Sequence, residues 1–287
     1  MHFLADRGGR IVEENSLQDR FLEWMYGHVA GRVLLRPLVS PVFSRAGGRF
    51  LDSRLSRLMI PAFIRNHSID MKEFEQKEYS SYNAFFKRRM LSGVREIEHA
   101  PQVFVSPCDS RLSVYRISRE QEFSIKNTKY TTEQLLRSRK LAGKYSGGYA
   151  WVFRLCVEDY HRYIYVDGGR VSPGICIPGV FHTVNPAAND RYPIYVENTR
   201  EYSLLQSEHF GTILQMEVGA LLVGKIENRT VSGTVRRGQE KGNFAFGGST
   251  VILLTQEGKV RPDKDILENS GKGIETKVKL GERVGCV

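Results

Sequence analysis

Hydrophobic and polar positions follow a helical period at the start of this chain and a strand-like period after about residue 100. Drawn at 100° per residue, the first stretch separates into an apolar arc and a polar arc. The apolar arc holds Leu17, Phe21, Trp24, Met25 and Val29, and the polar arc holds Asp19, Arg20, Glu23 and Gly27. Ser16 and Asp19 have the spacing of a capping box, and Pro37 is expected to end the pattern. The sequence therefore predicts an amphipathic helix that ends at Pro37, followed by an irregular apolar and basic stretch.

The second period predicts β-strands. Apolar, β-branched runs separated by Gly-rich turns predict strands at 150–157, 160–166, 213–218, 220–226, 233–236 and 249–254. The tripeptide Asp167-Gly168-Gly169 is typical of a hairpin turn. The fold class that follows is α+β: N-terminal amphipathic helices precede a mostly β domain of antiparallel, barrel-like sheets.

The composition is that of a globular protein with an excess of positive charge. Apolar residues make up 41% of the 287 residues and charged residues 26%, which excludes disordered, collagen-like and coiled-coil classes. Forty-two Lys and Arg against 32 Asp and Glu give a net charge of +10. A polyanion, either nucleic acid or an anionic membrane, is therefore an expected partner.

Much of this charge is arginine near the N-terminus. Between residues 20 and 65, eight Arg against one Glu and one Asp leave +6, interleaved with aromatic side chains. This combination is typical of a segment that lies at a membrane interface, although a helical layer with a solvated basic face has the same pattern. No apolar run approaches the ~20 residues of a spanning helix, and the first residues lack the apolar core of a signal peptide. If the protein meets a membrane, we therefore expect it to lie on the cytoplasmic face of that membrane, without a transmembrane segment.

Several familiar motifs are absent or incomplete. The cysteines at 108, 156, 176 and 286 are too widely spaced for a zinc site or a disulfide framework, which favours a reducing compartment and predicts no metal. A phosphate-loop spacing at 219–225 fails because Ile226 stands where Ser or Thr must be. The serine-hydrolase elbow fails because Val251 replaces its last glycine. No RNP or helix-turn-helix signature accompanies the basic residues.

Four short polar segments remain, and together they supply an acid, a base and a serine. They are Ser106-Pro107-Cys108-Asp109-Ser110, Asp159-Tyr160-His161-Arg162, Phe181-His182-Thr183-Val184-Asn185-Pro186 and Phe246-Gly247-Gly248-Ser249-Thr250-Val251. Taken singly, each is also typical of ordinary structure: an Asp cap, a strand histidine, a polar loop or a tight turn. Taken together, they permit two chemistries.

The first chemistry is acyl transfer, in which His161 deprotonates Ser249 and Asp109 orients the imidazole. The second uses the same groups on the protein itself. Ser249 Oγ attacks the carbonyl of Gly248, and the ester that forms gives a pyruvoyl group after β-elimination and hydrolysis. Glycine at 248 suits this step because its carbonyl is unhindered. A pyruvoyl ketone acts as an electron sink, as pyridoxal phosphate does.

The ordered set resembles the phosphatidylserine decarboxylases, which are pyruvoyl-dependent and self-processing. Residues 247–250 are similar to the family's L/V-G-S-S/T site, 106–109 to its S-P-x-D-G segment, and 159–162 to its D-Y-H-R segment. The similarity continues through residues 82–88, 182–186, 198–200, 218–224 and 241–244. Ile164 stands where the family commonly has a second histidine.

The resemblance implies cleavage between Gly248 and Ser249, into a β chain of residues 1–248 and an α chain of residues 249–287 that begins with the covalent pyruvate cofactor. The substrate amine would form a Schiff base with it, and phosphatidylserine would become phosphatidylethanolamine. Asp109, His161 and Ser249 are the implied catalytic residues, with His182, Asn185 and Arg162 binding substrate or supporting the site. Residues 1–78 would form a helical membrane-associating region and 79–287 the decarboxylase domain. Relatives imply a homodimer, with an anionic phospholipid membrane as partner and no nucleic acid.

Three alternatives stay open. Ile164 leaves room for another amine substrate, either a different serine lipid or a free amino acid. A serine hydrolase could use Asp109, His161 and Ser249 without cleaving the chain. A basic β domain that has lost catalysis could bind a membrane or nucleic acid.

Overall fold

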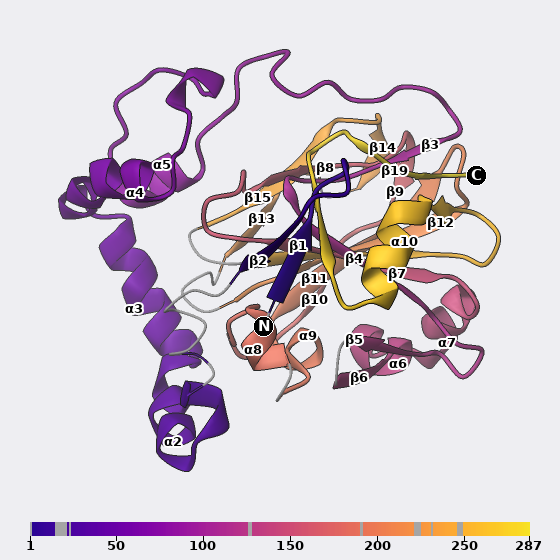
Figure 1. The fold of residues 1–287 in the computed structure, drawn as a ribbon, viewed down its shortest axis with the longest axis horizontal. Helices are drawn as coiled ribbons and strands as arrows, with labels where there is room; N and C mark the ends of the chain where they lie inside the picture. Colours follow the sequence, from indigo (N-terminus) through magenta and orange to yellow (C-terminus); the bar gives the residue numbers. More distant parts are fainter. Residues whose placement is uncertain are drawn as a thin grey trace.

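A large, mostly antiparallel sheet forms the centre of the computed structural model (Figure 1), which describes residues 2–14, 22, 24–125, 128–189, 192–220, 225–230, 232–245 and 249–287. The sheet order is β14-β9-β11-β12-β16-β7-β4-β18-β1-β2, and β10 also pairs with β11. Its strands are β1 (His2–Ala5), β2 (Ile11–Glu14), β4 (Ser110–Arg116), β7 (Tyr149–Leu155), β9 (Gly169–Val171), β10 (Ile175–Ile177), β11 (Arg200–Ser207), β12 (Thr212–Val218), β14 (Gly233–Val235), β16 (Ser249–Thr255) and β18 (Glu275–Val278). Because this path is open at β14 and β2, the sheet is not the closed barrel that the term barrel-like suggested.

Three smaller sheets complete the β structure. The order β13-β15-β8 joins β13 (Ile226–Asn228), β15 (Glu240–Phe244) and β8 (Arg162–Ile164). The order β17-β19-β3 joins β17 (Arg261–Pro262), β19 (Arg283–Cys286) and β3 (Val103–Val105). A hairpin pairs β5 (Glu122–Ile125) with β6 (Thr128–Thr131).

Apolar cores lie on both faces of the large sheet because successive side chains of its central strands point in opposite directions. Along β16, Val251 and Leu253 belong to one core and Ile252 and Leu254 to the other. The first core also holds Tyr163 of β8 and Phe244 of β15, so the β13-β15-β8 sheet covers this face. The second core includes side chains of the short helices α6 (Thr132–Leu136), α7 (Arg139–Ala142) and α9 (Ile194–Glu197). The remaining short elements are η3 (Gly143–Tyr145), α8 (Pro186–Asn189) and α10 (Lys264–Gly271).

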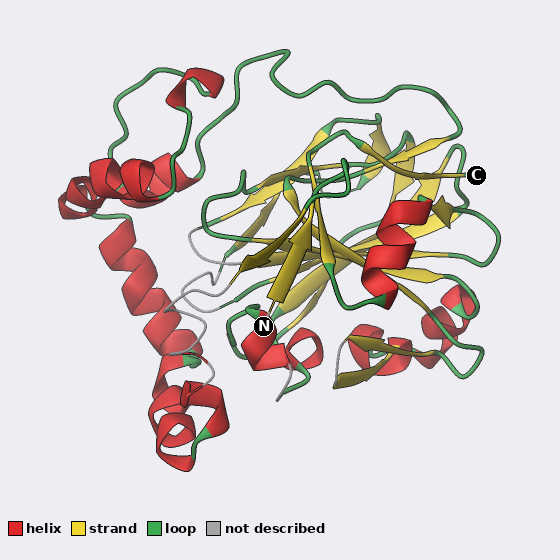
Figure 2. Cartoon of the chain, in the orientation of Figure 1, coloured by secondary structure: helices red, strands yellow, loops and turns green. Residues whose placement is uncertain are grey.

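The helices near the N-terminus form an arm beside the sheets, on the left in Figures 1 and 2. It contains α2 (Val29–Leu38), α3 (Pro41–Leu51), η1 (Arg54–Met59), α4 (Ile60–Asn66), η2 (Met71–Glu73) and α5 (Tyr82–Phe86). Ser40, Ser81 and Asp70 cap α3, α5 and η2 by accepting a hydrogen bond from a backbone amide near the start of each helix.

Two details of the predicted first helix are wrong. The backbone is extended at His28, and α2 begins anew at Val29. A side chain at Gly31 would lie 2.6 Å from the carbonyl oxygen of Met25, so this close approach requires glycine. Pro37 lies inside α2, which ends one residue later at Leu38; because proline has no N–H, the helix loses the hydrogen bond that this residue would donate. Residues 15–21 and 23, with the predicted cap at Ser16, lie outside the described residues.

The start of the chain contains strands that the hydrophobic pattern did not indicate. β1 and β2 pair as an antiparallel hairpin, and β1 also pairs in parallel with β18 near the C-terminus. Arg7 in the turn reaches Asp263 across 2.8 Å. In chain order, the helical arm therefore lies between this hairpin and the remaining strands of the sheet.

Most of the predicted strands are confirmed. The runs at 150–157, 213–218, 233–236 and 249–254 correspond to β7, β12, β14 and β16, and 160–166 contains the short β8. The predicted hairpin at Asp167-Gly168-Gly169 is wrong, because β8 pairs with β15 whereas β9 pairs with β11 and β14. This turn passes the chain from the small sheet to the large one. Of the predicted strand at 220–226, residues 221–224 lie outside the described residues.

Candidate active site

The predicted acid, base and serine lie on three segments that are tied together by backbone pairing. Ser249 is the first residue of β16 and faces Leu155 of β7 across the sheet. The chain then turns through residues 156–160 to His161, whose carbonyl oxygen accepts a hydrogen bond from the amide of Phe244, 2.9 Å away. Five residues after Phe244 the chain arrives at Ser249. These two pairings therefore tie Ser249 to the end of β7 and the His161 loop to the end of β15.

Ser249 is fully buried, and its Oγ has no hydrogen-bond partner among the described residues. Alternation along β16 places its side chain on the same face as Val251, the face covered by β8 and β15. Other buried hydroxyls of the described residues, such as that of Ser203, are also unpaired, so the distinguishing feature of Ser249 is its place at the start of β16, directly after the predicted cleavage site. Gly247 and Gly248, the other predicted residues of this turn, lie outside the described residues with Phe246.

The imidazole of His161 is buried and held by the backbone of its own loop. Its Nδ1 lies 2.9 Å from the carbonyl oxygen of Asp159. Because a carbonyl oxygen can only accept, Nδ1 carries the proton in the neutral ring and Nε2 carries the basic lone pair. The ring of Phe86 packs against the imidazole with 4.1 Å between ring centroids. The structure thus fixes the tautomer that a general base at Nε2 needs.

The carboxyl group of Asp159 has a perturbed acidity that its position in the D-Y-H-R motif did not reveal. Burial raises its pKa to about 7, and the negative charges of Glu158 and Asp109 act in the same direction. A hydrogen bond from the amide of Cys156, at 2.7 Å, and the charge of Arg111 oppose this rise. Asp159 is therefore a carboxyl group that titrates near neutral pH beside the histidine.

Asp109 ends the turn before β4, and its carboxylate is held in an ion pair. Arg95 donates to it from Nε at 3.2 Å and from Nη2 at 2.8 Å, and the amide of Leu280 donates to its Oδ1 at 2.8 Å. The turn is bound to β8 by a hydrogen bond from the amide of Ile164 to the carbonyl of Pro107. Arg95, which sequence reasoning missed, lies in an irregular segment without a motif. The imidazole contact that the acyl-transfer hypothesis gave to Asp109 is made by the backbone of Asp159.

A buried ion pair joins the small sheet to the large one behind this site. Lys241 Nζ of β15 lies 2.6 Å from each carboxylate oxygen of Glu217 on β12, and both side chains are buried. Asn228 of β13 donates to the same carboxylate at 3.2 Å. At the next position, a side chain on Gly242 would meet the carbonyl of Glu227 at 2.4 Å, which explains the Lys-Gly pair in the sequence. Breaking such a buried pair by removing one partner typically costs 3–5 kcal/mol.

Arg162 connects the D-Y-H-R loop to the end of the helical arm. Its Nε and Nη2 donate to the carbonyl of Lys87 at 3.2 and 2.6 Å, and Nε also reaches the carbonyl of Arg88. Its Nη1 pairs with Glu240 of β15 at 2.6 Å. These hydrogen bonds join the D-Y-H-R loop, the end of the arm and β15, so Arg162 has a structural role here.

His182 lies between Tyr26, which precedes α2, and Glu197 of α9. Tyr26 Oη is 3.2 Å from its Nδ1, and Glu197 Oε2 is 3.1 Å from its Nε2. Burial lowers the pKa of His182 to about 4, so the ring is neutral at pH 7 and donates from Nε2 to the carboxylate. The carbonyl of Asn185 accepts hydrogen bonds from the amides of Ala188 and Asn189 at α8. These two residues shape the 181–189 loop.

Ile164, at the position of the family's second histidine, lies in an apolar cluster. It packs with Phe74, Tyr160 and Leu280, and all four side chains are buried. These apolar surroundings suit a hydrocarbon side chain, so Ile164 contributes packing and does not transfer protons.

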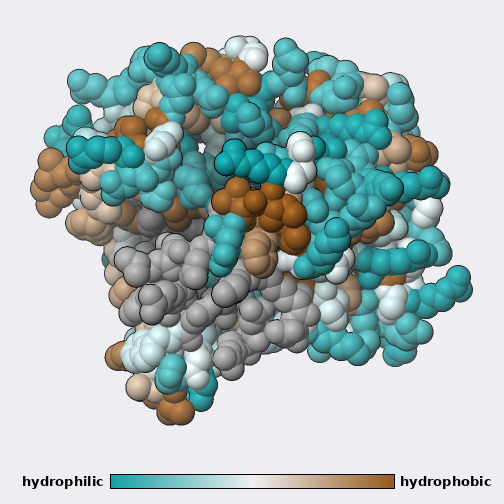
Figure 3. Space-filling view, viewed as in Figure 1, coloured by the Kyte–Doolittle hydropathy of each residue, from teal (hydrophilic) through white to brown (hydrophobic). Residues whose placement is uncertain are grey.

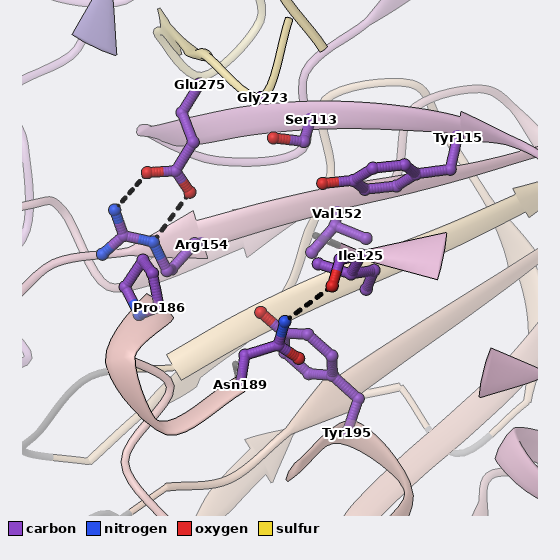
Figure 4. Close-up of a pocket in the computed structure, with 10 residues that line it drawn as sticks. All are labelled: Ser113, Tyr115, Ile125, Val152, Arg154, Pro186, Asn189, Tyr195, Gly273 and Glu275. Carbon is purple, nitrogen blue, oxygen red and sulfur yellow. Dashed lines mark hydrogen bonds and ion pairs between the residues drawn. The ribbon is translucent and has the colours of Figure 1, made fainter. Parts of the chain in front are cut away.

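A polar pocket lies on the opposite face of β7 and β4 (Figure 4). Arg154 and Glu275 form a bidentate ion pair at one side of it, and Tyr115, Asn189 and Tyr195 line the other side. Arg154 faces Thr250 across the ladder, one position beyond the Ser249–Leu155 pair. Alternation along the strands therefore points the Ser249 side chain away from this pocket.

Comparison with known proteins covers nearly the whole chain. The sequence pattern of a family described as phosphatidylserine decarboxylase matches residues 82–286. Phosphatidylserine decarboxylase proenzyme 2 of Clostridium acetobutylicum is 43% identical over 276 residues, which span 96% of this chain and 94% of that protein. The proenzyme of Clostridium tetani is 40% identical over 93% of this chain and 92% of its own. That of Fusobacterium nucleatum is 34% identical over 99% and 97%.

Proposed function

Because this chain belongs to the phosphatidylserine decarboxylase family, we propose that it is a self-processing, pyruvoyl-dependent enzyme that converts phosphatidylserine to phosphatidylethanolamine at a membrane surface. The observation that carries this proposal is the environment of Ser249. Ser249 begins a central strand, no group in the described part of the chain bonds its buried hydroxyl, and the His161 loop is bound to β15, the strand that precedes it. The curated relatives are named as proenzymes, which agrees with a processed chain.

Self-cleavage follows from the groups assembled there. His161 Nε2 accepts the Ser249 hydroxyl proton, and Oγ attacks the Gly248 carbonyl carbon. The amide C–N bond then breaks to give an ester, and the nitrogen takes up a proton. Loss of the α-hydrogen of residue 249 expels the Gly248 carboxylate and leaves dehydroalanine. Water hydrolyses this to a pyruvoyl group and ammonia. General-base assistance of this kind contributes about 10²–10⁴-fold.

The site suits the pyruvoyl group, because Ser249 is buried where no described side chain bonds its hydroxyl. When formed, this ketone supplies the electron sink for loss of CO₂ from an amino acid head group. His161 would then hold the proton that the product carbon takes up. The neighbouring apolar cluster of Ile164 would keep water from that side of the site.

The cleaved α chain would stay in place through its strands. β16 lies between β12 and β7. Further along the same segment, β18 pairs with β1 and β4, and β19 pairs with β3. Three strands of residues 249–287 are thus paired with strands of the preceding chain, so the bond between 248 and 249 is not needed to keep the fold together.

The helical arm supports action at a membrane surface. Exposed large apolar side chains follow one another along it: Val29, Val33, Leu34, Val42, Phe43, Phe50, Leu55, Leu58 and Met59. Figure 3 shows brown apolar surface at the outer ends of the arm. Residues 29–65 also carry seven Arg and one Asp, and basic residues near an anionic bilayer contribute about 1 kcal/mol each. Among the described residues, every helix is too short or too polar to span a bilayer. The arm would lie on the cytoplasmic leaflet that holds the substrate.

The test is a release assay for CO₂ from carboxyl-labelled phosphatidylserine in detergent micelles, with Ser249→Ala as the matched variant. We expect release by the wild-type protein, and loss of both release and chain cleavage in Ser249→Ala. Free serine and aromatic amino acids, assayed beside the lipid, should give none. Release from a free amino acid alone would overturn the lipid substrate. An uncleaved wild-type chain that reacts with a fluorophosphonate at Ser249 would indicate a serine hydrolase instead.

A further inference from the structure

We propose that Phe86, at the end of α5, is a positioning residue for His161 whose ring fixes the plane of the imidazole and thereby the direction of Nε2. This inference rests on the proposed function, since it assumes that His161 moves the proton. It extends that function by assigning a role to an aromatic residue of the 82–88 motif that contacts the histidine.

The rings of Phe86 and His161 are in close contact, and both are shielded from solvent. The two ring centroids lie 4.1 Å apart with 42° between the ring planes, and His161 and Phe86 are 1% and 0% exposed. The hydrogen bond from Nδ1 to the Asp159 carbonyl fixes one point of the imidazole. This hydrogen bond alone would permit the ring to tilt about that point. The face of Phe86 restrains such a tilt, because a tilt would drive the imidazole into it.

The backbones that carry the two rings are locked to each other. Arg162, next to His161, donates to the carbonyls of Lys87 and Arg88. In the reverse direction, Arg88 Nη2 donates to the carbonyl of Glu158 at 3.2 Å. The amide of Met90 donates to Tyr160 Oη at 3.3 Å. Residues 87–90 are therefore bonded to the 158–162 loop on both sides of His161, so the segments that carry the two rings are held together.

The helix that presents Phe86 is itself anchored in the arm. The amide of Tyr82 donates to Ser56 Oγ at 2.8 Å, and Asn83 Nδ2 donates to Asp52 Oδ1 at 2.7 Å. Leu51, Tyr82 and Phe86 share one buried apolar cluster. Contacts with α3 and η1 thus fix the position of the Phe86 ring independently of its contact with His161.

Phe85 offers a matched control in the same helix. It is as fully buried as Phe86, but its ring packs against Phe63, Tyr79 and Tyr82. It also stacks on the Arg88 guanidinium at 5.1 Å, and we expect Arg88 to keep its hydrogen bond to Glu158 when leucine replaces that ring. Phe85→Leu and Phe86→Leu should therefore lower the melting temperature similarly while differing in chemistry.

The experiment compares the two variants with wild type in the full-length protein. Self-cleavage is followed by gel over pH 6–9, and kcat and KM for phosphatidylserine are measured on the processed fraction. We expect Phe86→Leu to slow self-cleavage and lower kcat by at least about tenfold, with KM unchanged and a displaced pH profile. Phe85→Leu should keep kcat within about twofold and the wild-type pH profile.

If Phe86→Leu does not fold, Phe86→Met replaces it in the experiment, because methionine fills the volume without a planar ring. We expect Phe86→Met to show the losses predicted for Phe86→Leu. Equal losses in the Phe85 and Phe86 variants, or wild-type rates and pH profile in Phe86→Met, would overturn the proposal. A wild-type chain that never forms a pyruvoyl group would overturn the proposed function instead, so the two failures are distinguishable.

Discussion

At the scale of single residues, the D-Y-H-R loop orients His161 with main-chain atoms. The same loop contains the carboxyl group of Asp159, whose pKa lies near neutral pH. The carbonyl of Asp159 fixes His161, while the side chain of Asp159 turns back to the amide of Cys156. The backbone of Asp159 thus orients the imidazole, and its side chain is a titratable group with a pKa of about 7. The stability of the loop should therefore change with pH in the neutral range.

The first prediction concerns this carboxyl group. The folded-state pKa of Asp159 is raised above the ordinary value of 3.8, so the protonated form is the stabilising one. Its contribution is fully present below pH 3.8 and is lost as pH rises toward 7. Asp159→Asn, which mimics the neutral form, should be more stable than wild type at pH 8 by up to about 4 kcal/mol and equal to it near pH 4, since each pKa unit corresponds to about 1.4 kcal/mol.

Urea unfolding in a Ser249→Ala background, which keeps the chain whole, measures this difference between pH 4 and 8. The other titrating groups are common to both proteins, so the difference curve reports Asp159. A flat difference curve over this range would contradict the assignment.

At the scale of elements, the arm presents apolar side chains to solvent where a helical layer covering a core would bury them. In α2 only Gly31 and Leu35 are buried, and α4 buries none of its residues. Exposed apolar surface of this extent on helices marks an interaction site. The arginines among those side chains favour an anionic lipid surface over a neutral protein partner.

The second prediction tests the arm without deleting it, because residues 2–14 belong to the sheet and a long N-terminal deletion would disturb β18. Leu55 and Leu58 of η1 are 71% and 82% exposed. The double variant Leu55→Ser/Leu58→Ser should fold normally and bind phosphatidylserine-containing vesicles at least about tenfold more weakly, since each buried Leu contributes about 1.5–3 kcal/mol.

Vesicle co-sedimentation measures the binding, with Leu267→Ser on α10 as the control for an exposed leucine outside the arm. Binding of the wild type should also weaken as salt is raised, because the arginines act through screened charge. If the double variant sediments with vesicles as the wild type does, the arm is not the membrane-binding element.

At the scale of the whole molecule, the fold brings the N-terminus, the centre and the C-terminus of the chain into one sheet. The apolar runs predicted β7, β12 and β16 because these strands are buried on both faces, and the ordered motifs predicted Asp109, His161 and Ser249. The β1–β18 pairing was not predictable, since it joins segments some 270 residues apart and depends on the finished sheet. The Arg95–Asp109 pair and the acidity of Asp159 were not predictable either, because both depend on burial and on side-chain contacts that form only in the folded chain.

The central claim concerns the whole chain: the sheet holds the α segment on several sides, so that the backbone can break at Ser249 without loss of the fold. Intact mass spectrometry of the purified protein under denaturing conditions tests this most directly. The account predicts two chains, residues 1–248 and residues 249–287, the second being 39 residues long and lighter by one ammonia than a chain that begins with serine. Under native conditions the two should remain together. A single unmodified species of 32.7 kDa that persists through long incubation at neutral pH would contradict it.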